Sequence, residues 1–219
     1  MDDLTLSSAA SRTKLPQQRR SRERFERVLD ATELLLCESD NGEFTIQEVA
    51  ARSGVSVGVI YTRVQNKDDL IHLAQQRIIM RVQQEEHGLE GLPKPGASLD
   101  ETVAAVIEGF ASFLYRNAEV LRPVMNRASI DPEVAHTGNT AHARMMQRFI
   151  DALLEKRSEM LHPDPETAAD ACFRMVYATL TRYLCLGAAP ARVGRGEWNA
   201  IKRDLIEAMT LFLAAPRRR

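Results

Sequence analysis

The chain of 219 residues has a formal net charge of −1 and a hydrophobic content of 44%, so it can bury a substantial core as one or two domains. Only 5% of its residues are aromatic, while alanine and leucine are plentiful, a composition that suits an all-α bundle. No window of about 18 apolar residues and no basic-then-apolar leader occurs, which argues against a membrane span and a signal peptide and favours a cytoplasmic location.

The N-terminal segment is polar and basic. Residues 1–20 are rich in serine and interrupted by Pro16, so we expect them to be disordered when free. Between Arg12 and Arg27 there are seven basic residues and two acids, a net charge of +5. This segment is either a solvated tail or an arm that lays basic side chains along DNA phosphates. A first helix is expected from Ser21 to Glu38, where apolar residues recur at helical spacing.

The stretch from Thr45 to Lys67 predicts two short helices joined by a turn. Thr45 and Glu48 form a capping box that starts the first helix. Gly54 lies at the turn, because glycine reaches positive φ without a Cβ clash, and Ser56 is expected to cap the second helix. Such a helix-turn-helix puts the start of its second helix into a DNA major groove, although similar helix pairs occur in proteins that bind no DNA.

The segment AARSGVSVGVIYTRVQNKDDL closely resembles the DNA-binding domain of TetR-family transcriptional regulators. The positions that carry the resemblance are Ala50, Gly54, Val55, Ser56, Gly58, Ile60, Tyr61, Val64 and Lys67. Residues 27–36 also look like the first helix of that family, whereas Asp40 stands where the family usually has glycine. The resemblance implies a DNA-binding regulator, commonly a repressor released by a small-molecule effector, which acts as a homodimer on a near-palindromic operator in double-stranded DNA.

Ten residues are the candidates for contact with DNA: Thr45, Gln47, Ser56, Val57, Gly58, Val59, Tyr61, Thr62, Arg63 and Lys67. We expect Thr45, Tyr61 and Lys67 to hold phosphates and Gln47 to reach a base. Val57 and Val59 have no hydrogen-bonding side chain, so they are expected to contact thymine methyl groups. In the alternative, the two valines pack against their own domain and specificity comes from DNA shape.

About nine helices are expected in all, three of them in a helix-turn-helix domain (21–67) and the rest in a C-terminal bundle (68–219). After Lys67 the helices are expected at about 67–86, 98–116, 119–127, 131–161, 165–186 and 197–214. The resemblance makes the bundle the site of effector binding and dimerisation. The last two helices carry apolar stripes that either pair with a second subunit or belong to the core of one chain: Ala168, Cys172, Met175, Thr179 and Tyr183, and Trp198, Ile201, Leu205, Ala208 and Phe212.

The resemblance also implies an effector pocket among the middle helices. Its candidate lining residues are Phe110, Phe113, Tyr115, Met125, Asn126, Met145, Met146, Phe149 and Tyr177. Most of these would otherwise be plain core, because Met and Phe at helical spacing usually pack.

The sequence shows no catalytic or metal-binding pattern. The five histidines have no metal-ligand spacing and no Cys-x-x-Cys occurs, so we expect no catalytic site, metal or cofactor. The three cysteines are interpreted as reduced core residues. The competing hypothesis is a helical-bundle ligand carrier or enzyme with an incidental helix-turn-helix.

Overall fold

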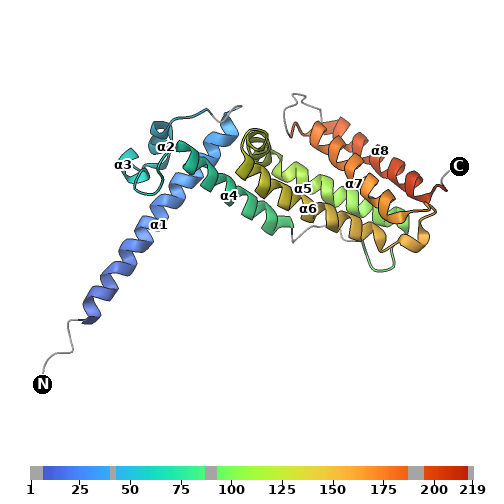
Figure 1. Ribbon diagram of the computed structural model, residues 1–219, viewed down its shortest axis with the longest axis horizontal. Helices are drawn as coiled ribbons and strands as arrows, with labels where there is room; N and C mark the ends of the chain where they lie inside the picture. The colour runs from blue at the N-terminus through green and yellow to red at the C-terminus, as the bar shows by residue number, and fades with distance from the viewer. Residues whose placement is uncertain (1–6, 40–42, 87–92, 187–194, 217–219) are drawn as a thin grey trace, which may run out of the picture. The chain divides into compact units, whose positions relative to one another are not determined.

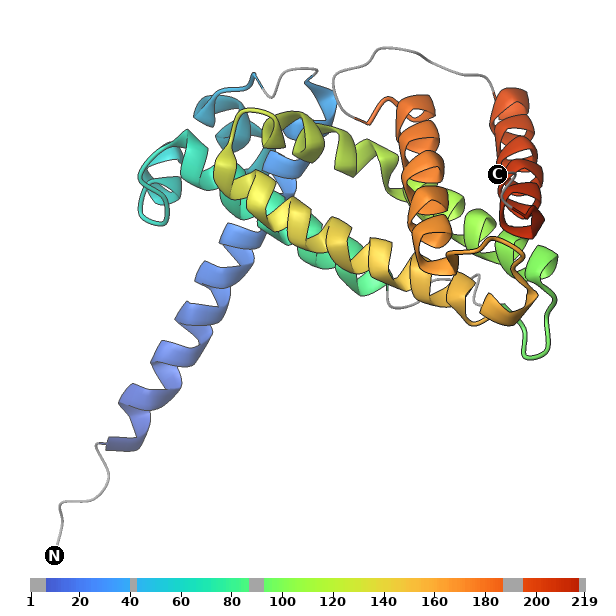
Figure 2. The same ribbon diagram turned by 45° about the vertical axis from the view of Figure 1, so that its right-hand side comes forward.

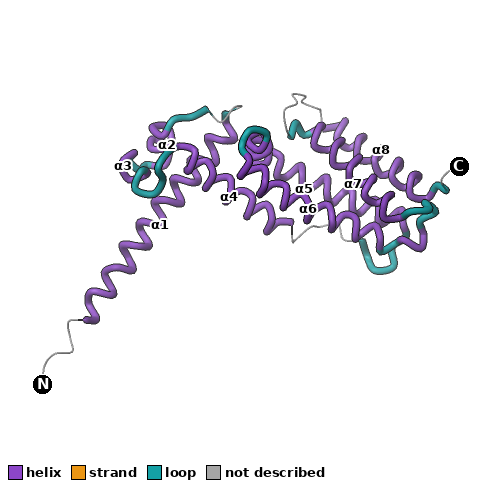
Figure 3. Tube along the Cα trace, in the orientation of Figure 1, coloured by secondary structure: helices purple, strands orange, loops and turns teal. Residues whose placement is uncertain are grey.

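A computed structural model of the chain describes residues 7–39, 43–86, 93–186 and 195–216. These residues form eight α-helices and one short 3-10 helix, with no strand among them (Figure 3). The all-α class expected from the sequence is confirmed, with one helix fewer than nine. By internal contacts the chain divides into an N-terminal unit (1–77) and a C-terminal unit (78–219). The division falls inside α4 (Lys67–Glu86). No helix in the described ranges is long and apolar enough to cross a membrane.

The N-terminal unit contains α1 (Ser7–Glu38), α2 (Ile46–Ser53), α3 (Val57–Ile60) and the first part of α4 (Figure 1). Its first helix differs from expectation, because it begins at Ser7 and includes most of the segment expected to be disordered. Alanine, glutamine, lysine and arginine in that segment favour helix. Once a helix has formed its first turn, each added residue gains one hydrogen bond, so the helix can extend into this segment. Both ribbon views show the first half of α1 extending away from α2 and α3 (Figures 1 and 2).

A small apolar core holds the N-terminal unit together. Its buried members come from all four helices and the turns between them: Val28, Leu29, Ala31, Leu36, Phe44, Ile46, Val49, Val55, Ile60, Val64, Leu70, Ile71 and Ala74. Asn66 caps α4, accepting a hydrogen bond from the amide of Asp69 at 2.9 Å. Ile60 of α3 belongs to this core together with residues of α1, α2 and α4, so the position of the short α3 is set by packing rather than by its own helix formation.

The C-terminal unit contains the end of α4, then α5 (Leu99–Ala128), α6 (Pro132–Leu154), the 3-10 helix (Arg157–Glu159), α7 (Pro165–Tyr183) and α8 (Arg195–Ala214). Helix α5 replaces two expected helices, which accounts for the lower count. Asn117 lies where the break was expected, but its side-chain amide donates to the Phe113 carbonyl at 3.0 Å and the helix continues. Pro123 lies inside the same helix, where its ring removes one backbone hydrogen bond without ending the helix.

The stripes on α7 and α8 are divided between core and surface. Ala168, Cys172 and Leu205 are buried within the single chain, and Phe212 is partly buried against the same core. These residues therefore belong to the core of one chain, the second of the two readings that the sequence leaves open. On the described parts of α7 and α8, the large apolar side chains that stay exposed are Met175, at 40% exposure, and Leu211, at 63%.

Candidate nucleic-acid interface

The turn between α2 and α3 has the geometry of a helix-turn-helix. The hydroxyl of Thr45 accepts from the Glu48 amide at 3.2 Å, and the Glu48 carboxylate accepts from the Thr45 amide at 2.7 Å, which completes the capping box. Gly54 has φ 67° in the left-handed region and its amide donates to the Ala50 carbonyl. Ser56 precedes α3, but its side chain makes no capping hydrogen bond.

Helix α3 is a single turn, and part of it is exposed to solvent. Ile60 and Val64 are buried and anchor the turn. Gly58 is exposed on α3, Tyr61 and Thr62 are exposed in the turn that follows it, and Gln47 is exposed on α2. A Cβ atom placed on Gly58 would meet no other atom within 4 Å, so this face of α3 is open.

The two valines of α3 have different surroundings. Val57 is half-buried and packs against the core of the N-terminal unit. Val59 is 40% exposed and borders a small hollow whose other wall is α1. An apolar contact with a thymine methyl group is thus open to Val59 more than to Val57.

Several polar candidates already have partners within the N-terminal unit. The hydroxyl of Thr45 lies 2.8 Å from the Glu48 carboxylate, so a phosphate at this helix start would meet a negative charge. Hydrogen bonds from Thr45 lower the pKa of Glu48, which keeps that charge in place. Lys67 donates to the Phe44 carbonyl at 3.2 Å and lies over the Phe44 ring. The hydroxyl of Thr62 donates to the Val59 carbonyl at 2.6 Å.

Helix α1 supplies neighbours of α3 that the sequence pattern did not reveal. Arg63 donates to the hydroxyl of Ser21 at 2.8 Å and its guanidinium lies 5.6 Å from the centre of the Phe25 ring. Arg24 joins Ser21 and Phe25 in the α1 wall of the hollow next to α3. The only sequence signal for this surface was the positive charge before Arg27.

In the C-terminal unit the structure gathers part of the predicted effector set into an aromatic cluster. Phe110 lies 5.8 Å from Phe149 and 6.3 Å from Tyr177, measured between ring centroids. Two further members were not predicted: Phe173, which stacks on Tyr177 at 5.6 Å, and His142, whose ring lies 4.5 Å from that of Tyr177. The cluster joins α5, α6 and α7.

The other candidates for effector contact lie around or away from this cluster. Phe113 is buried, and Met125, Met145 and Met146 are partly buried against the same core. Asn126 lies sixteen residues after Phe110 on α5, which is about 24 Å along a helix axis. Its side-chain oxygen is buried without a hydrogen-bond partner. Tyr115 is 48% exposed and its ring lies 5.7 Å from Trp198.

The aromatic cluster is uncharged at neutral pH. Burial lowers the pKa of His142 and raises the pKa of Tyr177, so both side chains stay neutral. Burial also raises the pKa of the Cys172 thiol to about 12, which leaves it unreactive. Within the described ranges, no three His, Cys, Asp or Glu side chains are placed to hold a metal ion.

Solved structures with the same fold extend over most of the chain. A TetR-like transcriptional regulator from Rhodococcus sp. RHA1 is 21% identical and superposes with a TM-score of 0.60, covering 88% of this chain and 96% of its own. A protein assigned to the TetR family from Mesorhizobium loti MAFF303099 is 16% identical and superposes with a TM-score of 0.62. The match covers 87% of this chain and 96% of its own. A protein described as a transcriptional regulator from Saccharomonospora viridis was solved in complex with choline. It is 18% identical and superposes with a TM-score of 0.64, and the match covers 85% of this chain and 96% of its own.

The sequence itself matches no family model. A search of curated proteins also finds no match. The fold is nevertheless clear: this chain has the fold of the TetR-family transcriptional regulators over nearly the full length of its structural neighbours. The resemblance recognised in residues 50–67 is thereby confirmed at the level of the fold.

Proposed function

We propose that the chain is a sequence-specific DNA-binding transcriptional regulator, a repressor that a small-molecule effector releases from its operator. The observation that carries this proposal is the helix-turn-helix, with Gly54 in the left-handed conformation and the outer face of α3 open to solvent. A helix start with no obstructing side chains can enter a major groove, which is about 12 Å wide.

In this proposal only a few side chains contact the bases. Gln47 and Tyr61 are exposed and carry hydrogen-bonding ends, and glutamine pairs well with adenine. Gly58 allows the backbone of α3 close to the groove floor, and Val59 offers an apolar contact. Phosphate contacts come from Lys67, whose ammonium group has donors beyond the one given to Phe44.

A homodimer fits the surface of α7 and α8. Met175 is flanked by Ala171 and Ala178 on α7, and Leu211 lies three residues after Ala208 on α8. Small residues around a large apolar one let helices of a second subunit approach closely. A two-fold dimer would place two N-terminal units on a near-palindromic operator.

The aromatic cluster around Tyr177 is the proposed effector region. One structural neighbour was solved with choline, and aromatic faces attract quaternary ammonium ions. Choline is therefore the first compound to test, by titration against the fluorescence of Trp198. A shift that disappears in Tyr177→Ala would support this region, and no shift would direct the search to other ligands.

The proposed function is tested by selection from a pool of random-sequence duplexes with the purified chain. The expected result is a recurring near-palindromic motif, the operator of this protein. A variant with Gln47→Ala and Tyr61→Ala should recover no motif while keeping its helical circular dichroism. A helical-bundle carrier or enzyme would recover no motif even as wild type.

A further inference from the structure

Helix α1 carries three different faces in the turns that adjoin α3. At about 100° per residue, Ser21, Phe25 and Val28 share one face, and these residues border α3 or the core. Glu26, Asp30 and Glu33 share a second face. Arg20, Arg24 and Arg27 share the third face, about a third of a turn from each of the others. These three arginines are called the basic strip, and all are exposed.

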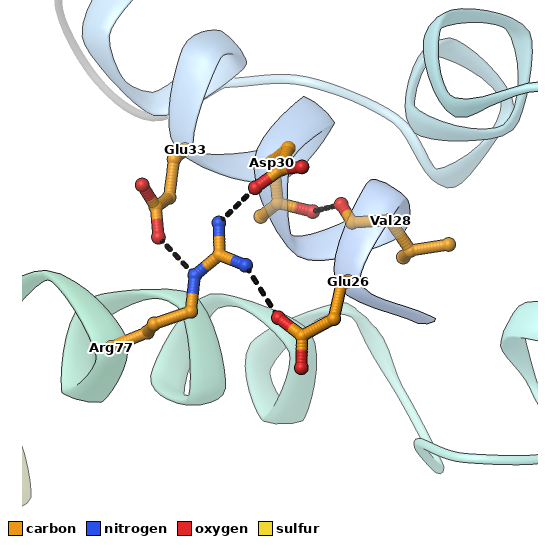
Figure 4. A network of polar contacts seen from close by, with 6 residues as sticks. Glu26, Val28, Asp30, Glu33 and Arg77 are labelled. Atoms are coloured by element: carbon orange, nitrogen blue, oxygen red, sulfur yellow. Dashed lines mark hydrogen bonds and ion pairs between the residues drawn. The ribbon is translucent and has the colours of Figure 1, made fainter. Parts of the chain in front are cut away.

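The acidic face of α1 is neutralised by one residue of α4. The guanidinium of Arg77 pairs with Glu26, Asp30 and Glu33 at 2.5 to 2.9 Å (Figure 4). Burial opposes the charge of Arg77, but these hydrogen bonds outweigh it and raise its pKa. The fourth acid of this part of α1, Glu23, pairs with Arg19 at 3.0 Å. The acids are thus held by partners of their own.

The basic strip has no such partners in the part of the chain that the structure describes. Among the residues that the structure describes, Arg20, Arg24 and Arg27 make no ion pair, since the acids on α1 are directed to Arg77 and Arg19. Three unpaired positive charges thus line one side of a helix whose negative charges lie on another side. Such a segregated field attracts a polyanion.

The basic strip adjoins α3 and the turn that follows it. Arg24 shares the small hollow, about 40 Å³ in volume, with Val59, Thr62 and Arg63. The bond from Arg63 to Ser21 fixes that turn of α1 against the end of α3. A duplex held by α3 would therefore pass close to Arg24 and its neighbours on the strip.

We propose that the basic strip of α1 is a second DNA-binding surface, which holds backbone phosphates beside the base pairs contacted by α3. The proposal rests on the proposed function, because the duplex must first be held by α3. From Arg20 to Arg27 the strip is about 10 Å long. Phosphates of one strand follow at about 3.4 Å along the duplex, so the strip spans about three of them. It adds affinity and salt dependence without base specificity.

The test compares two variants that lose the same charge. The strip variant carries Arg24→Gln and Arg27→Gln, and the control variant carries Arg116→Gln and Arg144→Gln in the C-terminal unit. All four arginines are exposed, so both variants should fold, which thermal unfolding checks. A third variant, Arg22→Gln, removes an exposed charge of α1 outside the strip.

Affinity for the selected operator and for sheared genomic duplex is measured across a salt series. The strip variant should reduce the slope of log K against log salt by about two on both DNAs, since each phosphate contact contributes about 0.9. The control variant and Arg22→Gln should leave the slope unchanged. An unchanged slope in the strip variant, or an equal loss in either control, would overturn the proposal.

A second arm uses operators trimmed to the edges of the selected motif. Removing the flanks should weaken wild-type binding and leave the strip variant unaffected. Equal weakening of both proteins would mean that the strip does not touch the flanks, which contradicts the proposal. If wild type binds the operator normally while the strip variant shows no defect, this inference fails and the proposed function stands. If wild type recovers no operator, both fail.

Discussion

Arg63, which follows the recognition helix, donates a hydrogen bond to the hydroxyl of Ser21 on α1 at 2.8 Å. The same guanidinium lies over the Phe25 ring, so two contacts join the end of α3 to the first helix. The sequence had placed Arg63 among the groups that touch DNA. In the structure these contacts also give Arg63 a way to position α3 against α1.

The first prediction separates these two roles of Arg63. Arg63→Met should weaken operator binding several-fold without changing the salt slope, because a positioning residue neutralises no phosphate. Ser21→Ala removes the acceptor and should have an effect in the same direction. A slope that falls by about one in Arg63→Met would show instead that this arginine holds a phosphate.

The second prediction concerns Gly58. A Cβ at this position meets nothing within 4 Å, and alanine stabilises helices by about 0.5–1 kcal/mol relative to glycine. Gly58→Ala should therefore keep or raise the unfolding midpoint. Its operator affinity should fall at least tenfold if the backbone of α3 approaches the groove floor. Thermal unfolding and operator binding should be measured on the same preparation of the variant. If Gly58→Ala keeps its operator affinity, the backbone of α3 lies further from the bases than proposed.

The third prediction concerns Gln75 of α4, which is 1% exposed in the N-terminal unit. Neither its side-chain nitrogen nor its oxygen has a hydrogen-bond partner among the described residues. Gln75→Met keeps the length of the side chain and removes both polar atoms, so urea unfolding should show a gain of about 1–3 kcal/mol. A loss of stability would mean that the amide is satisfied in solution, for example by water.

The fourth prediction is a dependence of stability on pH. Burial lowers the pKa of His142 below the 6.5 of a free imidazole, so the unfolded chain binds the proton more readily. The stability contributed by the neutral ring is full above about pH 6.5 and is lost as the pH falls toward the folded value. In His142→Phe the unfolding midpoint should decline less than in wild type between about pH 7.5 and about pH 5. The exposed His136 provides the control, since His136→Gln should follow wild type.

The fifth prediction locates the dimer interface. Leu211 is 63% exposed on α8 and Met175 40% exposed on α7. A variant with Leu211→Lys and Met175→Lys should sediment as a folded monomer and bind the operator weakly. Ile130, which is 76% exposed outside these helices, provides the control, and Ile130→Lys should remain a dimer. An unchanged dimer in the double variant would place the interface on another surface.

Local chemistry made much of the fold predictable. The capping box at Thr45 and the left-handed Gly54 depend on residues close together in the sequence, and each was predicted correctly. The continuous α5 was missed, since a buried Asn117 that bonds its own helix looks in sequence like a break. The early start of α1 at Ser7 was also missed, because polar residues suit either disorder or an exposed helix.

The candidate site was less predictable because its contacts are distant in sequence. No spacing rule connects Arg63 with Ser21, or Arg77 with Glu33. The periodicity of α7 and α8 likewise could not distinguish a core stripe from an interface. Only packing shows that Cys172 and Leu205 are buried within one chain.

The most direct test of the central claim is the ratio between two affinities of the wild-type chain at one salt concentration. One is for the operator recovered by selection and the other for a scrambled duplex of equal length. A sequence-specific regulator should favour the operator by about a thousandfold or more. A ratio near one would contradict the assignment of α3 as a reader of DNA sequence.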